Sequence, residues 1–160
     1  MCKLIEASRL KKERCATSRF GIIDSQSVKT IYGDSQRGID GGKKIKGLKR
    51  YIIFCTQGHI LAVHVHAANR HDSVAASVVI ARALSKYSTI KTICGDAGYR
   101  GTAVDVVENL ASRAMQIVKK LPAGWTILPK RWIVEHSFEW LNTNRRLSKD
   151  YEVNLKSSEI

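Results

Sequence analysis

Short apolar runs alternate along the chain with polar and glycine-containing stretches, and five of these runs have the length and residue types of β-strands. They are residues 20–24, 50–55, 60–67, 90–96 and 115–118. The second and third runs are separated by residues 56–59, which include a glycine and predict a β-hairpin. Between the first and second runs, glycines and charged residues over 31–49 predict a loop.

Three later segments carry apolar residues at helical spacing: 74–87, 102–113 and 130–147. A short basic helix is also expected over 4–14. The predicted core order is therefore three strands, helix, strand, helix, strand, helix. This order predicts an α/β domain with a mixed five-stranded sheet and helices packed on it. It is also the order of elements in the ribonuclease-H-like fold, which is an analogy at the level of the fold alone.

The same pattern divides the chain into three parts. We expect a basic tail or short helix over 1–18, one α/β domain over 19–152 and a C-terminal tail over 153–160.

Three acidic residues stand where these elements would place a side chain at one edge of the sheet. Asp24 and Asp96 end the first and fourth predicted strands, and Glu135 lies on the last helix near the border of its apolar face. The two strands become neighbours if the chain reverses direction beside the first strand, as in open α/β sheets. An aspartate at a strand end is also a common turn or cap residue. The ordered trio favours a shared site over that alternative.

Three like charges in one place repel one another unless a cation neutralises them. A ligand set made only of carboxylate oxygens suits Mg²⁺ or Mn²⁺ rather than zinc. Two such ions about 3.5–4 Å apart stabilise the attacking and leaving oxygens when a phosphodiester is displaced. The trio therefore predicts metal-dependent phosphoryl transfer.

The net charge is +13, from 27 Lys and Arg against 14 Asp and Glu, and it indicates a polyanionic partner such as nucleic acid. No apolar run approaches the ~18 residues that cross a bilayer, and the first residues lack the apolar core of a signal peptide. We therefore expect a cytoplasmic protein with no membrane partner. Its four cysteines form no C-x-x-C pair and are expected to be reduced.

Six segments together carry a resemblance to a known family. They read IDSQSVK, GGKKIKGLKR, AANRHD, GDAGYRG, LPKRWIVE and NRRLSKDYE, and they begin at positions 23, 41, 67, 95, 128 and 144. In order and spacing they are similar to bacterial insertion-sequence transposases of the Asp-Asp-Glu type, in the branch around the fifth insertion-sequence family. The resemblance spans roughly residues 20–152.

This resemblance implies that Asp24, Asp96 and Glu135 hold two catalytic Mg²⁺ or Mn²⁺ ions. Arg131 matches the arginine that stands four residues before the family's glutamate. Three other positions, where the family often has Tyr, Arg and Lys, depart from the pattern: Leu128, His136 and Asn142. These departures affect DNA contacts rather than metal ligands. The match covers the catalytic half of such enzymes, which leaves recognition of the DNA ends to a separate upstream polypeptide or a missing region.

Eight basic side chains are candidates for contacts with DNA phosphates: Lys43, Lys44, Lys46, Lys49, Arg50, Arg131, Arg145 and Arg146. The first five also fit an ordinary solvated loop. The last two also fit the usual preference for cations near a helix C-terminus. Arg131 lies one turn before Glu135, and an ion pair with that glutamate is the alternative to a phosphate contact.

Supporting roles at the site are expected for His71, Asp72 and Tyr99. The His-Asp pair resembles a family motif near the site, and Asp72 is equally suited to cap the following helix. The sequence leaves two interpretations of Tyr99: it stacks on a nucleotide, or it packs at the start of a helix. Trp132 and Trp140 are expected in the core rather than stacked on bases.

The leading hypothesis is a transposase that nicks DNA at the end of a mobile element and joins the freed 3′-hydroxyl to target DNA. Such an enzyme would act as a homo-oligomer on DNA in the bacterial cytoplasm, associated with the nucleoid. A stand-alone nuclease or resolvase of the same fold would cut without joining. A catalytically decayed transposase fragment would only bind DNA.

Overall fold

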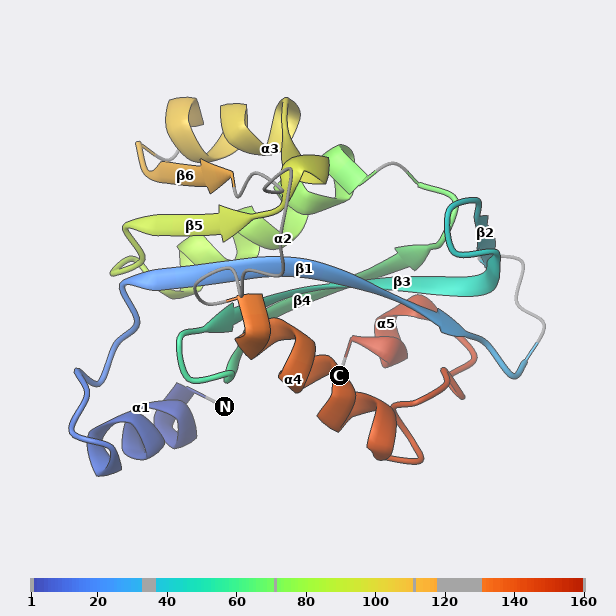
Figure 1. Cartoon of the computed structure of the whole chain (residues 1–160), viewed down its shortest axis with the longest axis horizontal. Helices are drawn as coiled ribbons and strands as arrows, with labels where there is room; N and C mark the ends of the chain where they lie inside the picture. The colour runs from blue at the N-terminus through green and yellow to red at the C-terminus, as the bar shows by residue number, and fades with distance from the viewer. Residues whose placement is uncertain (1, 33–36, 71, 111, 118–130, 160) are drawn as a thin grey trace, which may run out of the picture.

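The computed structural model describes residues 2–32, 37–70, 72–110, 112–117 and 131–159 of the chain (Figure 1). The described residues form one six-stranded sheet with the order β2-β3-β1-β5-β6, in which β4 also pairs with β3. The strands are β1 (Phe20–Lys29), β2 (Gly38–Asp40), β3 (Ile45–Cys55), β4 (Ile60–Ala67), β5 (Thr92–Gly95) and β6 (Ala114–Ile117).

Strand directions divide the sheet into two halves. β1, β3 and β4 pair antiparallel, as the predicted hairpin requires, and β2 adds to β3 in the same manner. β5 and β6 run parallel to β1 and are reached through helical connections. The mixed sheet and its α/β class are confirmed, and β2 is the strand that the sequence did not predict.

Helices cover both faces of the sheet (Figure 1). They are α1 (Cys2–Lys11), α2 (Asp72–Lys86), η1 (Ala97–Tyr99), α3 (Thr102–Asp105), η2 (Val106–Leu110), α4 (Arg131–Thr143) and α5 (Leu155–Ser158). Side chains alternate between the faces along β1. Ile23 belongs to the core beneath α2, whereas Ile22 belongs to the core beneath α4. Among the described residues, no helix combines the length and the apolar character needed to cross a membrane.

The segment predicted as a loop contains β2 and the beginning of β3. Gly47 gives the physical reason, because a Cβ atom there would lie 2.0 Å from the carbonyl oxygen of Val28. Gly38 is restricted in the same way, with the Asn69 side chain 2.4 Å from such an atom. These glycines permit close approach of neighbouring backbones rather than marking an irregular loop.

The predicted C-terminal tail folds back onto β4. Leu155 joins an apolar cluster with Val65. Glu159 Oε1 accepts a hydrogen bond from the Val65 amide at 2.9 Å and lies 2.7 Å from His64 Nδ1. Its other oxygen accepts a hydrogen bond from Arg82 of α2 at 2.7 Å. This segment is therefore part of the folded domain.

Candidate active site

Asp24 and Asp96 occupy matching positions on neighbouring parallel strands. β1 and β5 pair in register up to Ile22 opposite Cys94, and two further residues along each chain bring Asp24 opposite Asp96. The backbone of Asp96 is still extended. Because side chains alternate along extended chains, both carboxylates lie on the face of Ile22, which is the face that α4 covers.

Asp24 lies in the middle of β1 rather than at its end, which corrects the sequence prediction. The strand continues because the polar residues after Asp24 keep pairing with β3, as far as Lys29 opposite Gly47. β5 ends at Gly95, so β1 extends beyond its parallel neighbour. Asp24 stands where this parallel pairing stops.

Backbone amides orient both aspartates. The Ser25 N–H donates to Asp24 Oδ1 at 2.7 Å, and the Gly98 N–H donates to Asp96 Oδ1 at 2.9 Å. The second bond makes Asp96 the N-cap of η1. Each bond fixes the direction of a carboxylate beside the end of β5.

Tyr99 lies next to both aspartates. Its side chain is only 2% exposed and packs edge-on against Tyr51, with ring centroids 6.5 Å apart. Burial raises the pKa of Tyr99 well above its ordinary value, and the charges of Asp24 and Asp96 raise it further. Gly95 allows this packing, since a Cβ there would lie 2.9 Å from the tyrosine ring. Tyr99 therefore takes the packing role rather than an exposed stacking role.

α4 crosses the same face and carries Glu135 on its flank. Val134 is fully buried in the core that contains Ile22, and Phe138 packs edge-on against Phe54 with centroids 5.5 Å apart. Glu135 follows Val134 by about 100° around the helix and is exposed. The helix thus places it at the border of its buried face, as the sequence predicts.

The three predicted ligands are not gathered into one assembled cluster. Among the described residues, no group of three or more Asp, Glu, His or Cys side chains is arranged to hold a metal ion. Continued by two residues, the register of β1 and β5 brings Asp24 opposite Asp96, and α4, which carries Glu135, packs on the same face. Ligation by all three stays a prediction.

The C-terminal part of α4 and the segment after it are held to the sheet by polar contacts. Gln26 Nε2 donates to Asn142 Oδ1 at 2.6 Å. Arg50 donates from Nη1 to the Leu147 carbonyl at 2.6 Å and from Nη2 to Asp150 Oδ2 at 3.1 Å. Arg50 was predicted to contact DNA from a loop, but it is buried in β3 and bonded within the protein.

Lys49 is also buried in β3 rather than exposed on a loop. Its Nζ lies 3.7 Å from Asp40 Oδ2 and 5.8 Å from the ring centroid of Tyr51. Burial raises the pKa of Asp40, but hydrogen bonds from Ser27 and the following turn, together with the Lys49 charge, outweigh burial and lower it. Lys49 and Asp40 therefore form part of a buried polar network.

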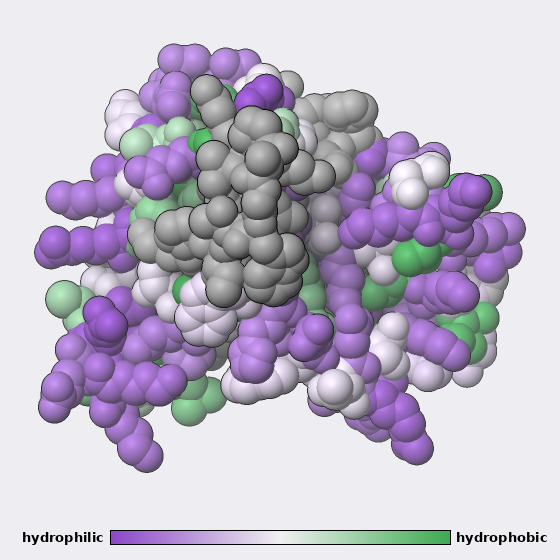
Figure 2. All heavy atoms as spheres, viewed as in Figure 1, coloured by the Kyte–Doolittle hydropathy of each residue, from purple (hydrophilic) through white to green (hydrophobic). Residues whose placement is uncertain are grey.

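Five of the predicted basic contacts are exposed: Lys43, Lys44, Lys46, Arg145 and Arg146. The lysines lie on the turn before β3 and at its start, and the arginines follow α4. Among the coloured residues, Figure 2 shows mainly hydrophilic side chains on the face that it presents. His71 and the side chains of Asp72 and Arg131 lie outside the described residues.

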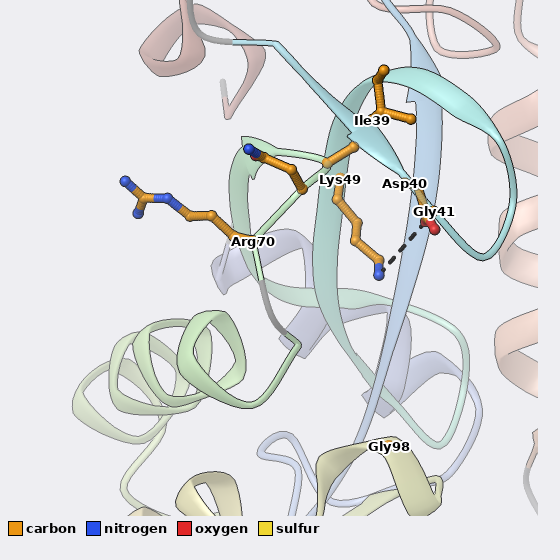
Figure 3. A pocket seen from close by; sticks show the side chains of 8 residues that line it. Ile39, Asp40, Gly41, Lys49, Arg70 and Gly98 are labelled. Carbon is orange, nitrogen blue, oxygen red and sulfur yellow. Dashed lines mark ion pairs between the residues drawn. The ribbon is translucent and has the colours of Figure 1, made fainter.

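A cavity of about 390 Å³ is lined by residues of β2, β3 and the segment after β4, together with Gly98 of η1 (Figure 3). Asp40 and Lys49 lie within it and point toward each other, whereas Arg70 extends outward from it. Gly98 forms part of the lining, and its amide is the one bound to Asp96. The cavity therefore adjoins the loop that carries one of the two aspartates.

Trp132 and Trp140 lie on the solvent side of α4, which corrects the prediction that they belong to the core. They are 55% and 67% exposed. His136 stands between them, with ring centroids 6.5 Å from Trp132 and 4.8 Å from Trp140. The apolar spacing was correct for α4, but these aromatic rings follow its outer face.

The model of the transposase DDE domain family matches residues 16–156 of the chain. The chain belongs to this family. It is thus a transposase domain, and its fold is α/β with a mixed sheet. Transposase DDE domains generally depend on divalent metal ions. No curated protein matches the chain at a significant level.

Solved structures similar to this transposase domain include the catalytic core of BIV integrase, at 12% identity and a TM-score of 0.48. The Mos1 strand transfer complex matches at 11% identity and a TM-score of 0.49. The Mos1 transposase paired-end complex with the left transposon end matches at 11% and 0.37. The matches cover 79%, 98% and 72% of this chain, which spans 68%, 49% and 39% of those chains.

Proposed function

We propose that this domain cuts and rejoins DNA strands during transposition, with Asp24, Asp96 and Glu135 as the carboxylates that hold its metal ions. One observation carries the proposal. The register of β1 and β5, continued two residues past Ile22 and Cys94, supports it by bringing the two aspartates opposite each other on the face against which α4 packs. The family supports the class of reaction, and this geometry supports the roles of the residues.

The residues present fit a hard divalent cation. Two adjacent aspartates repel each other unless a cation lies between them, and oxygen-only donors favour Mg²⁺ or Mn²⁺. The amide bonds to Asp24 and Asp96 hold both carboxylates in fixed directions. Glu135, exposed on the flank of α4, completes the set when its side chain turns toward the pair. Two bound ions would stabilise the attacking and leaving oxygens of a phosphodiester.

The proposed chemistry needs no covalent enzyme intermediate. In the first step, a water oxygen attacks the scissile phosphorus and the bond to the 3′ oxygen breaks, leaving a 5′-phosphate and a 3′-hydroxyl. In the second step, that hydroxyl loses its proton and attacks a target phosphorus, whose own 3′ oxygen leaves. The second step exchanges one phosphodiester bond for another. The protein's part is to position the strands and balance their charge.

Exposed cations provide the proposed contacts with DNA phosphates. Lys43, Lys44 and Lys46 on one side and Arg145 and Arg146 on the other belong to this surface. The net charge of +13 supports a polyanionic partner. We leave the two buried cations of β3 out of it, because they already bond within the protein.

Several copies of the domain would act together on the two element ends and the target DNA. They would do so in the bacterial cytoplasm at the nucleoid.

Replacement of Glu135 by Gln tests the proposal. We expect Glu135→Gln to reduce Mn²⁺-dependent nicking of supercoiled plasmid more than about 100-fold, because the amide lacks the charge that holds the metal. DNA affinity should stay within about twofold, since no phosphate contact is lost. Glu139→Gln is the matched control, because Glu139 is exposed on the same helix. Equal nicking by the two variants would contradict the assigned role.

A DNA-binding domain without catalysis is the second candidate. It is favoured by the finding that, among the described residues, no three candidate ligands form a metal-binding group. Calorimetric titration with Mn²⁺ separates the two, because an inactive relic would show no specific uptake. A stand-alone nuclease would bind the metal but would not join a pre-nicked DNA end to plasmid.

A further inference from the structure

Gln26 and Asn142 form a hydrogen bond between β1 and α4 across 116 positions of the chain, with Nε2 2.6 Å from Oδ1. Gln26 is only 9% exposed, whereas Asn142 lies on the exposed flank of the helix. The bond thus joins the buried surface of the sheet to the side of α4.

Both partners are aligned with the proposed metal ligands. Along β1, Gln26 is the next residue after Asp24 on the same face, about 6.5–7 Å away. Along α4, Asn142 lies two turns, or about 10.5 Å, beyond Glu135 and only about 20° from it around the helix. The bond therefore holds the flank that carries Glu135 beside the strand that carries Asp24.

The apolar contacts of α4 do not fix its rotation in the same way. Val134 and Phe138 pack on the sheet through contacts that are not directional, whereas a hydrogen bond has narrow limits of distance and angle. A rotation of 20° would move a glutamate carboxylate by about 2 Å. Metal–ligand distances tolerate only about 0.2 Å. Small changes in helix rotation would therefore remove Glu135 from a shared ion.

We propose that Gln26 and Asn142 are a positioning pair, which sets the rotation of α4 and thereby places Glu135 to bind metal together with Asp24. This inference rests on the proposed function of the three carboxylates. It assigns a role in catalysis to two residues that act through the helix and do not touch the metal.

Two single variants and their combination test the pair. Gln26→Met keeps the size of the buried side chain and removes the donor, and Asn142→Ala removes the acceptor at an exposed position. We expect each to lower the kcat of plasmid nicking about 10–100-fold and to weaken Mn²⁺ binding without DNA about tenfold. The KM for plasmid should stay within about twofold. Both substitutions remove the same bond. The double variant should therefore lose no more kcat and Mn²⁺ affinity than the more impaired of the two single variants.

Thr143→Ala is the matched control. Thr143 is the next residue on the helix and is exposed, and its hydroxyl bonds to the Trp140 carbonyl rather than to the sheet. This variant should keep the wild-type kcat and Mn²⁺ affinity. Urea unfolding of every variant reports stability separately. A purely structural pair would lower stability without changing the Mn²⁺ affinity of the folded protein.

Wild-type kcat and Mn²⁺ affinity in Asn142→Ala would overturn the proposal, and so would losses that add up in the double variant. Asn142→Ala keeps the test decisive even if Gln26→Met fails to fold, because Asn142 is exposed. Glu135→Gln separates the two levels of inference. If Glu135→Gln abolishes nicking while Asn142→Ala keeps the wild-type kcat and Mn²⁺ affinity, the positioning role alone fails. If Glu135→Gln still nicks DNA, the proposed function itself fails.

Discussion

Arg50 and Asp150 form an ion pair that is almost completely shielded from water, with side-chain exposures of 8% and 1%. The second guanidinium nitrogen donates to the Leu147 carbonyl. The other carboxylate oxygen accepts bonds from the Glu152 amide and the Ser158 hydroxyl. These contacts join the segment after α4 to the centre of β3, so they support the helix that carries Glu135.

Arg50→Met should destabilise the domain by about 3–5 kcal/mol, because it leaves the buried Asp150 carboxylate without its cation. Urea unfolding measures the loss. Lys46→Met, an exposed change on the same strand, should stay within about 0.5 kcal/mol. If the two variants lost similar amounts of unfolding free energy, burial of the ion pair would not be the cause of the loss.

Residue type was readable from the sequence, but burial was not. Asp24 and Asp96 were found because each follows an apolar run. Lys49 and Arg50 were placed in a loop because nearby glycines and lysines resemble one, and their acidic partners lie far along the chain or in an unpredicted strand. Asn142 was noticed as a departure from a family pattern, but its bond to Gln26 depends on tertiary structure.

The turn of the β3–β4 hairpin packs against α4. Gly58 in this turn has a φ of +80°, and a Cβ there would lie 3.0 Å from Ser137 Oγ of the helix. A residue other than glycine is strained by this backbone conformation and crowded by the helix. The turn therefore needs glycine for two independent reasons.

Gly58→Ala should lower the free energy of unfolding by about 1–2 kcal/mol. Gly41→Ala provides the control, since its Cβ would have nothing within 4 Å. Urea denaturation of both variants checks the difference. The strain argument is wrong if Gly58→Ala is as stable as Gly41→Ala.

Element types were more predictable than element ends. Apolar runs found five strands, and helical spacing found α2 and α4. β1 and β3 extend into polar sequence because Gln26 and Ser27 are buried by bonds to distant residues, Asn142 and Asp40. A single-sequence pattern contains no trace of these long-range partners, so both strands were predicted too short.

At the scale of the whole molecule, one carboxylate, that of Glu159, holds the C-terminal segment in place in a chain that carries a large excess of positive charge. Glu159 binds the Val65 amide, His64 and Arg82 at once, and so connects α5 to β4 and α2. Burial raises the pKa of Glu159, but these hydrogen bonds outweigh burial and lower the pKa from its ordinary 4.5. The sequence predicted a tail here because four residues of helix give too short a pattern to recognise.

Because the folded-state pKa of Glu159 lies below 4.5, its stabilisation is fully present above that pH and is lost as the pH falls through the folded value. Glu159→Gln should therefore be less stable than wild type near neutral pH, by a difference that shrinks in acid. Urea unfolding at several values between about pH 3 and 7 measures this. A difference that stays constant over the whole range would contradict the assignment.

The most direct test of the central claim is an anomalous-scattering map of crystals grown with Mn²⁺. The proposed site predicts a manganese peak bound by carboxylate oxygens of Asp24, Asp96 and Glu135, at the distances of about 2.0–2.2 Å usual for small divalent cations. Well-ordered crystals with manganese only at other positions, or with none at these carboxylates, would contradict it.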